Sequence, residues 1–74
     1  MHIETLIRMA NQIGAFFDAM PDREEALHEL VQHIRRFWEP RMRKELLAYV
    51  DGGPGSELSG TVTEAIVKHR AVLA

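Results

Sequence analysis

Residues 22–40 read DREEALHELVQHIRRFWEP, and their apolar side chains recur every three or four positions, as on one face of an amphipathic α-helix. This stripe contains Ala26, Leu27, Leu30, Val31, Ile34, Phe37 and Trp38. Asp22 and Glu25 have the form of a capping box, and Pro40 disfavours a helical conformation at the residue before it. The pattern predicts a helix over residues 23–38.

The segment before this one predicts a helix over residues 3–18, with two apolar stripes side by side. The first stripe contains Ile3, Leu6, Ile7, Ala10, Gly14 and Phe17, and the second contains Met9, Ile13, Phe16 and Met20. Together they span an arc of about 180°, whereas one supporting face requires roughly 100°. Either the helix is sandwiched inside its own fold, or the second stripe meets another chain.

Pro40 suits the first turn of a further helix, predicted over residues 41–50, because its fixed φ angle is compatible with a helix start. One face of this helix aligns Met42, Leu46 and Val50. The glycines and the proline within residues 51–58 then predict a loop, because neither residue type favours a helix interior.

A last helix is predicted over residues 60–72, with Ser59 as its N-cap. No segment alternates apolar and polar residues as a half-buried strand would. The sequence therefore predicts an all-α fold in a single domain of residues 1–74. We expect a small bundle of three main helices plus a C-terminal helix after the glycine-rich loop.

The composition limits what such a chain can carry. With 74 residues and a mass of 8.5 kDa, it can bury only a thin core. The absence of cysteine excludes disulfides, thiolate metal sites and cysteine-ligated iron–sulfur clusters. No apolar run approaches the roughly 20 residues of a membrane span, and no basic flank with an apolar stretch opens the chain. We expect a soluble, cytoplasmic protein that does not enter a membrane.

Charge is distributed unevenly along the chain, whose net charge is −2. Residues 1–34 carry six acidic and two basic side chains, a net charge of −4, while residues 35–44 carry five basic side chains against one acidic, a net charge of +4. This separation predicts an oriented partner or a self-complementary contact, although a solvated charged face is the simpler alternative.

The basic block coincides with the junction of two predicted helices. Residues 33–43 hold the only tryptophan, an adjacent phenylalanine, a proline and four arginines. Arg, Trp and Met are enriched where protein surfaces meet. We therefore predict a partner-binding surface that comprises Arg35, Arg36, Phe37, Trp38, Arg41, Met42 and Arg43, together with Met9, Ile13, Phe16 and Met20.

Two of these arginines have no evident role within the fold. Arg41 and Arg43 begin a predicted helix, where the helix dipole disfavours cations. An acidic patch on a partner would favour them there. Phe37 and Trp38, in contrast, lie on the apolar stripe of their own helix, so they are candidates for the core as well as for docking.

The residues that commonly perform chemistry form no recognisable constellation. His28 and His33 are five positions apart, about 140° around a helix, and cannot share a metal ion. The serines and threonines belong to no nucleophile motif, and the glycines of residues 52–55 follow no strand and precede no Gly-Lys-Ser/Thr. We predict no catalytic, cofactor-binding or metal-binding residues and no cofactor.

The basic junction could instead contact nucleic acid, as in a helix-turn-helix reader. Against this, the pI is about 6.0, and the helix that would enter the groove begins with Pro40 and lacks side chains that commonly read base edges. We predict no nucleic-acid partner.

Several motifs occur in a recognisable order. They are MANQI at residues 9–13, Phe16-Phe17, Pro21-Asp22, and HI-x-RFWEPRM at residues 33–42. With them the chain resembles the delta subunit of soluble NAD-dependent formate dehydrogenases, over about residues 5–50. The Phe-Trp-x-Pro-Arg-Met core is the most specific part, and in that family Asp often stands where this chain has Glu39.

The resemblance implies a non-catalytic, cofactor-free accessory subunit of a cytoplasmic complex that oxidises formate to carbon dioxide and reduces NAD⁺. In that family an alpha subunit holds a molybdenum bis-molybdopterin guanine dinucleotide centre and iron–sulfur clusters. A beta subunit holds FMN and binds NAD, and a gamma subunit holds another cluster. The expected partner is the alpha subunit, and no catalytic residue is carried over.

Three roles remain open at this point. The chain could dock on the alpha subunit and stabilise it, act transiently as an assembly factor during molybdenum cofactor insertion, or be a self-associating helical regulatory module. Its wide apolar arc also predicts a homodimer when the chain is isolated.

Overall fold

The computed structural model describes residues 2–53 and 57–74, and within them the chain forms five helices and no strand. They are α1 (Ile3–Phe17), α2 (Arg23–Phe37), α3 (Pro40–Asp51), α4 (Gly60–Lys68) and α5 (Arg70–Leu73). The predicted all-α fold is confirmed, and the first three helices begin and end within one residue of their predicted bounds. Of the predicted loop, residues 54–56 lie outside the described part.

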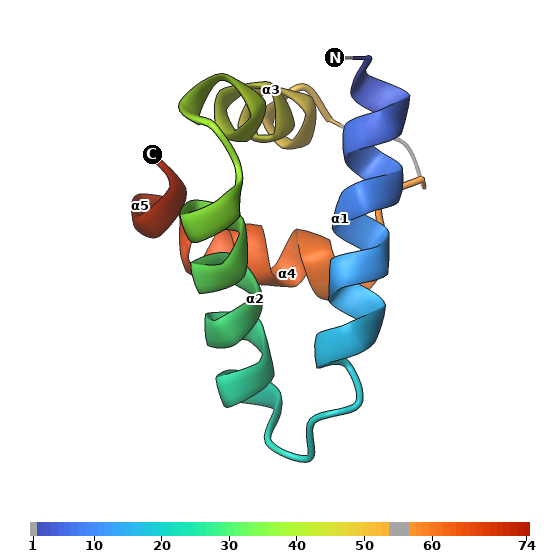
Figure 1. The fold of residues 1–74 in the computed structure, drawn as a ribbon, viewed down its shortest axis with the longest axis vertical. Coiled ribbons are helices and arrows are strands. Elements are labelled where there is room, and N and C mark those ends of the chain that lie inside the picture. The colour runs from blue at the N-terminus through green and yellow to red at the C-terminus, as the bar shows by residue number, and fades with distance from the viewer. Residues whose placement is uncertain (1, 54–56) are drawn as a thin grey trace.

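The helices α1 and α2 form an antiparallel hairpin that α4 crosses on one side (Figure 1). At the end of the hairpin away from its turn, α3 packs across α1, and the short α5 lies beside α2. The apolar core lies between the hairpin and α4, and it extends to α3 and α5. Because α4 covers only one side of the hairpin, no helix among the described residues lies along the other side.

Three local signals place the helix ends. The Asp22 side chain accepts a hydrogen bond from the Glu25 backbone amide at 3.1 Å, and Ser59 Oγ accepts one from the Val62 amide at 3.3 Å. Pro40 is the first residue of α3. These caps satisfy amides that have no partner inside their own helix, so the predicted starts of α2 and α4 are confirmed.

The two adjacent aromatics of the junction separate. Trp38 follows α2 in an extended conformation, with φ −94° and ψ 140°, and its side chain is buried in the core with 5% of its surface exposed. Phe37, the last residue of α2, is 69% exposed. A core position for Phe37, as the apolar stripe suggested, is therefore wrong. Its ring lies against His33, one turn earlier, with ring centroids 4.7 Å apart.

The predicted single helix over residues 60–72 is also wrong. His69 interrupts it with φ −117° and ψ 31°, which separates α4 from α5. The turn lets α5 pack against α2, where Leu73 is 1% exposed. Arg70 pairs with Asp51 through both of its terminal nitrogens, at 2.7 and 2.5 Å, and so links α5 to α3.

Asn11 of α1 holds the segment that leads into α4. Its side-chain amide donates to the Glu57 carbonyl oxygen at 2.8 Å, and its Oδ1 accepts from the Ser59 backbone amide at 2.8 Å. This paired contact fixes the start of α4 against the middle of α1. The sequence showed Asn11 only as part of a motif, because its two partners lie more than 40 positions away.

Gly14 sets the distance between α1 and α4. A Cβ atom added at this position would lie 2.7 Å from Val62 Cγ2, which is closer than packed carbon atoms approach one another. Val62 is fully buried and β-branched, so it has little freedom to move away. Gly14 is therefore required for the close packing of α4 on the hairpin.

We expect Gly14→Ala to destabilise the protein. Overpacking costs about 1–3 kcal/mol, while the better helix propensity of alanine returns about 0.5–1 kcal/mol, so the net loss should be about 1 kcal/mol in urea unfolding. Gly60→Ala is the matched control, because a Cβ atom there meets nothing within 4 Å. It should leave stability unchanged or raise it, and an equal loss in both variants would contradict the role given to Gly14.

Candidate docking groove

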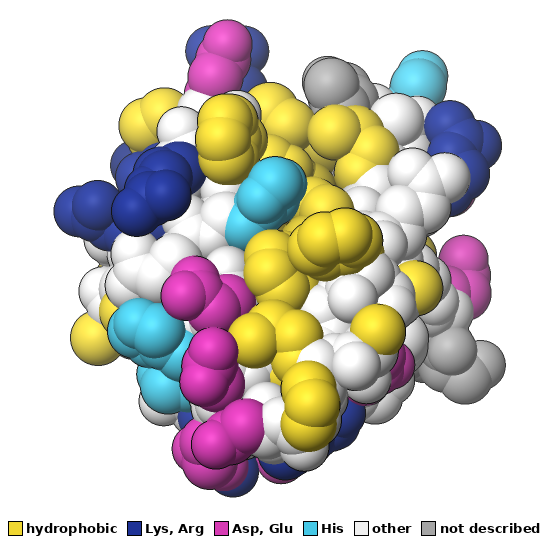
Figure 2. Space-filling model, turned by 60° about the horizontal axis from the view of Figure 1, so that its bottom comes forward, with side chains coloured by type: hydrophobic (Ala, Val, Ile, Leu, Met, Phe, Trp, Pro, Cys, Tyr) yellow, Lys and Arg dark blue, Asp and Glu magenta, His cyan; other side chains and the backbone are white. Residues whose placement is uncertain are grey.

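An apolar groove of about 620 Å³ lies on the side of the hairpin that α4 leaves uncovered. It is lined by Met9, Gln12, Ile13, Phe16, Phe17, His33, Phe37, Trp38 and Met42. These residues come from α1, the last two turns of α2, the residue that caps α2 and the first turn of α3. In Figure 2 the hydrophobic side chains form a continuous band over this region, with a histidine beside them.

A row of rings spans the groove from α1 to α2. Phe16 and Phe17 meet edge to face, with centroids 5.0 Å apart, and Phe17 meets His33 at 5.9 Å. His33 then contacts Phe37, so the row ends on α2. Phe16 is 73% exposed, and with Phe37 it forms the outer edges of the groove. Large apolar side chains gathered and exposed in this way are typical of a surface that another molecule covers.

The structure joins two features that the sequence presented as separate. Three groove residues belong to the second apolar stripe of α1, namely Met9, Ile13 and Phe16, and three belong to the helix junction, namely Phe37, Trp38 and Met42. The sequence analysis missed Gln12, Phe17 and His33. His33 stands four positions before Phe37, which was the one available sign that their rings would meet on a helix.

The second stripe of α1 is partly buried and partly open. Met9 and Ile13 pack against the core with one side and line the groove with the other. Phe16 is exposed, and Met20 is half-buried beyond the end of α1, outside the groove. The stripe is therefore not sandwiched inside the fold of this chain.

The predicted arginines differ in what they contact, and none of them lines the groove. Arg43 Nη1 donates to the carbonyl oxygens of Arg35 and Trp38, at 3.2 and 3.1 Å. Carbonyls at the end of a helix lack partners within it and carry the negative end of its dipole, so Arg43 caps α2. The expectation that Arg43 has no role within the fold is therefore wrong. Arg35 Nε donates to the Val72 carbonyl oxygen at 3.1 Å and attaches α5.

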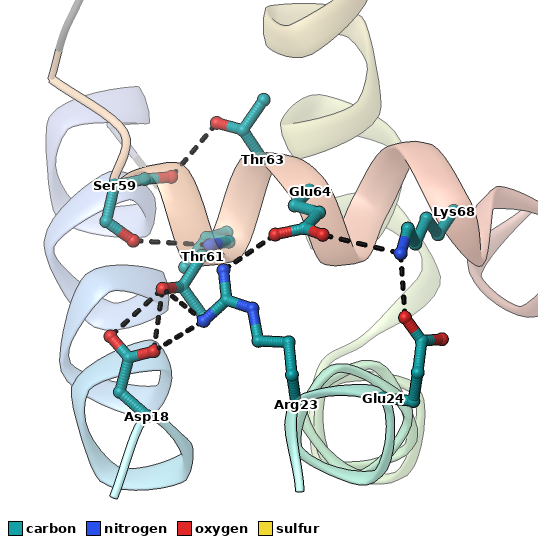
Figure 3. A network of polar contacts seen from close by, with 9 residues as sticks. Asp18, Arg23, Glu24, Ser59, Thr61, Thr63, Glu64 and Lys68 are labelled. Carbon is teal, nitrogen blue, oxygen red and sulfur yellow. Dashed lines mark hydrogen bonds and ion pairs between the residues drawn. The ribbon is translucent and has the colours of Figure 1, made fainter.

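On the other side of the hairpin, polar side chains fasten α4 to α1 and α2 (Figure 3). The Asp18 carboxylate accepts the Thr61 hydroxyl at 2.8 Å and Arg23 Nη1 at 2.9 Å. Arg23 Nη2 also donates to Glu64 at 2.6 Å. Each of these charged side chains is 38–48% exposed, so water screens the pairs and their joint geometry matters more than any single one.

Lys68 closes this network from the far end of α4. Its ammonium group donates to Glu24 at 2.7 Å and lies 3.4 Å from Glu64. The hydrogen bond from Arg23 lowers the pKa of Glu64, with a further contribution from Lys68. The hydrogen bond to Glu24, followed by the one to Glu64, raises the pKa of Lys68. Both shifts favour the charged forms that make the contacts.

Two arginines of the junction remain without such contacts. Arg36 and Arg41 are exposed, and neither makes a hydrogen bond or ion pair with any residue that the structure describes. Each directly precedes a groove residue in the chain, Phe37 and Met42 respectively. Their guanidinium groups are therefore unpaired in the described part of the chain, next in sequence to residues that line the groove.

Within the described residues, no three His, Cys, Asp or Glu side chains are grouped closely enough to hold a metal ion. His28 and His69 meet in a pair, with ring centroids 5.7 Å apart. The same residues include no helix with both the length and the apolar content that crossing a bilayer requires.

The family model of the NADH-dependent formate dehydrogenase delta subunit FdsD matches residues 5–66 of the chain. The chain belongs to this family. The matched span of the delta subunit family includes every residue that lines the groove and most of α4, so it extends beyond the motifs noted in the sequence. The resemblance drawn from those motifs is confirmed. No curated protein and no solved structure matches the chain.

Arg43→Ala should destabilise the protein by about 1–2 kcal/mol, because it removes two charge-assisted hydrogen bonds at the end of α2. Arg41→Ala, two positions earlier, should change stability by no more than about 0.5 kcal/mol, since Arg41 is exposed. Thermal and urea unfolding of both variants would test this. Equal stability of the two would show that the cap contributes nothing.

The lowered pKa of Glu64 predicts how stability depends on pH. A carboxyl group whose pKa falls on folding stabilises the native state fully above its ordinary value of 4.5, and this contribution is lost as the pH falls through the folded pKa. Glu64→Gln should therefore be less stable than the unaltered protein at pH 7 and equal to it in acid. Glu29→Gln is the control, because Glu29 is exposed and unpaired among the described residues. A deficit of Glu64→Gln that is constant with pH would contradict a charge effect.

Proposed function

We propose that this chain is a non-catalytic accessory subunit of a cytoplasmic NAD-dependent formate dehydrogenase, which oxidises formate to carbon dioxide with reduction of NAD⁺. In this proposal it docks through the apolar groove on the alpha subunit and stabilises it. Membership of the delta subunit family supports the association with such a complex. The observation that carries the docking role is the exposed groove, with its two outer phenylalanines.

The composition of the groove favours docking over chemistry. Seven of its nine lining residues are apolar, and the other two are Gln12 and His33. His33 is the one side chain in the lining that could act as a base, and the lining offers no hydroxyl, thiol or carboxylate for it to activate or pair with. Methionine and aromatic side chains instead provide large contact areas that adapt to a partner.

The accessory role can take two forms, which differ in how long the chain stays bound to the alpha subunit. A stabilising subunit stays in the mature complex at fixed stoichiometry, whereas an assembly factor would hold the alpha subunit during molybdenum cofactor insertion and then leave. The breadth of the apolar surface favours the lasting form, because an uncovered groove is costly in water. In isolation, the same surface should drive weak pairing with a second copy of the chain, which sedimentation at micromolar concentration would detect.

The double variant Phe16→Ser/Phe37→Ser should recover the other formate dehydrogenase subunits about tenfold less well when a tagged chain is co-expressed with them and purified. Both side chains are mostly exposed, so its stability should change little. Val67→Ser is the matched control, because Val67 is 64% exposed but lies on α4, away from the groove. Normal recovery with the double variant would exclude the groove as the docking surface.

A further inference from the structure

We infer that the groove receives one amphipathic helix of the partner subunit, oriented so that its carboxylates meet Arg36 and Arg41. This inference rests on the proposed function and adds to it the kind of segment that binds and its direction. Three observations carry it: the helical walls of the groove, the spacing of its apolar residues, and the order of the charges along its edge.

The walls of the groove favour a helix over an added β-strand. A peptide that binds as a strand adds main-chain hydrogen bonds to a sheet edge, and the described residues contain no strand. The backbone groups of helical walls are already hydrogen-bonded within each helix, and the side chains of the walls form ridges with grooves between them. The ridges of another helix pack into such grooves. On the opposite side of the hairpin, α4 already packs in this way.

The apolar residues of α1 give the length of the contact. Met9, Ile13 and Phe16 are separated by four and three positions, so they extend over about 10 Å, or two helical turns. A partner helix would match them with apolar side chains at i, i+3 or i+4, and i+7. A segment of about three turns is therefore sufficient to fill the groove.

The charges along the α2 edge change sign from one end to the other. Arg36 lies seven positions after Glu29, so the two share one flank of the helix about two turns apart, and Glu25 lies one turn before Glu29. On the face drawn in Figure 2, basic side chains lie higher and acidic side chains lower to the left of the hydrophobic band. Arg41 adds to the basic end. A partner helix with acidic residues at that end and basic residues at the other would bind in one direction.

The unpaired state of these arginines strengthens the argument. In the described residues, Arg23, Lys68 and Arg70 each pair with a carboxylate of this chain. Arg36 and Arg41 stand beside the groove without one. Arg8 and Lys44 are also exposed and unpaired among the described residues, so what distinguishes Arg36 and Arg41 is that each directly precedes a groove residue in the chain.

A second copy of the chain fits the charges but not the shape. Antiparallel pairing of two α2 edges would bring Arg36 of each copy near Glu29 of the other. The groove is concave, however, and two concave surfaces placed face to face would leave a void, whereas stable interfaces pack as densely as protein interiors. A convex helix fills the same space.

Photo-cross-linking in the intact complex tests the kind of occupant. We would place p-benzoylphenylalanine at position 16 or 37 of a tagged chain, co-express it with the other subunits, irradiate the purified complex and map the products by mass spectrometry. We expect one alpha-subunit segment, with cross-linked positions three, four or seven apart and acidic residues near one end. The same probe at position 67, on α4, should not reach that segment.

Products that join two copies of this chain, or a partner segment without helical spacing, would overturn the inference and leave the proposed function intact. An intact complex whose partner is cross-linked from position 67 and not from position 16 or 37 would overturn it as well. If the unmodified tagged chain recovers no formate dehydrogenase subunit, the proposed function itself fails.

Charge reversal tests the direction. Arg36→Glu/Arg41→Glu should bind the partner about tenfold more weakly at low salt, with the difference shrinking as salt is raised. Arg8→Glu is the control, since Arg8 is exposed on α1 and does not line the groove. Replacing the acidic residues of the cross-linked segment by lysine should restore binding of the double variant. Equal binding by both arginine variants would overturn the orientation.

Discussion

The close approach of α4 to α1 at Gly14 determines most of this structure. With no side chain at Gly14, Val62 enters the space between the hairpin helices and contributes to a core that also receives Leu30. Two sets of hydrogen bonds keep α4 in this position. Asn11, in the middle of α1, holds the residue before α4, and the Asp18–Arg23–Glu64 network holds α4 to the C-terminal end of α1 and the start of α2. The described part of the chain thus places α4 on a single side of the hairpin.

The groove follows from that placement. After α4 has covered one side of α1 and α2, the described part of the chain has only α3 and the single turn of α5 left, and both pack at the end of the hairpin. The wide apolar arc of α1 is therefore half core and half surface, and its exposed half is where a partner would add stability.

Local rules predicted much of the fold because they depend on neighbours in the chain. Periodic apolar residues, the caps at Asp22 and Ser59, and Pro40 at a helix start each act within one or two turns. The break at His69 was missed because the packing of Leu73 against α2, rather than any glycine or proline, accompanies it. Likewise, the sequence analysis predicted six of the nine groove residues as partner-binding. It could not predict that they line one groove, because this depends on how α1, α2 and α3 pack together.

The helix junction shows how one short segment can serve both the fold and a surface. Pro40 ends α2 and starts α3 within three residues, so successive side chains point to different surroundings. Trp38 turns into the core while Phe37 stays at the groove, and Arg43 turns back to cap α2 while Arg41 faces solvent. The contacts of Trp38 fix the backbone from which Phe37 projects, and the contacts of Arg43 fix the backbone from which Arg41 projects. A partner at this surface would therefore meet Phe37 and Arg41 on a backbone that is already fixed, so that little backbone entropy is lost on binding.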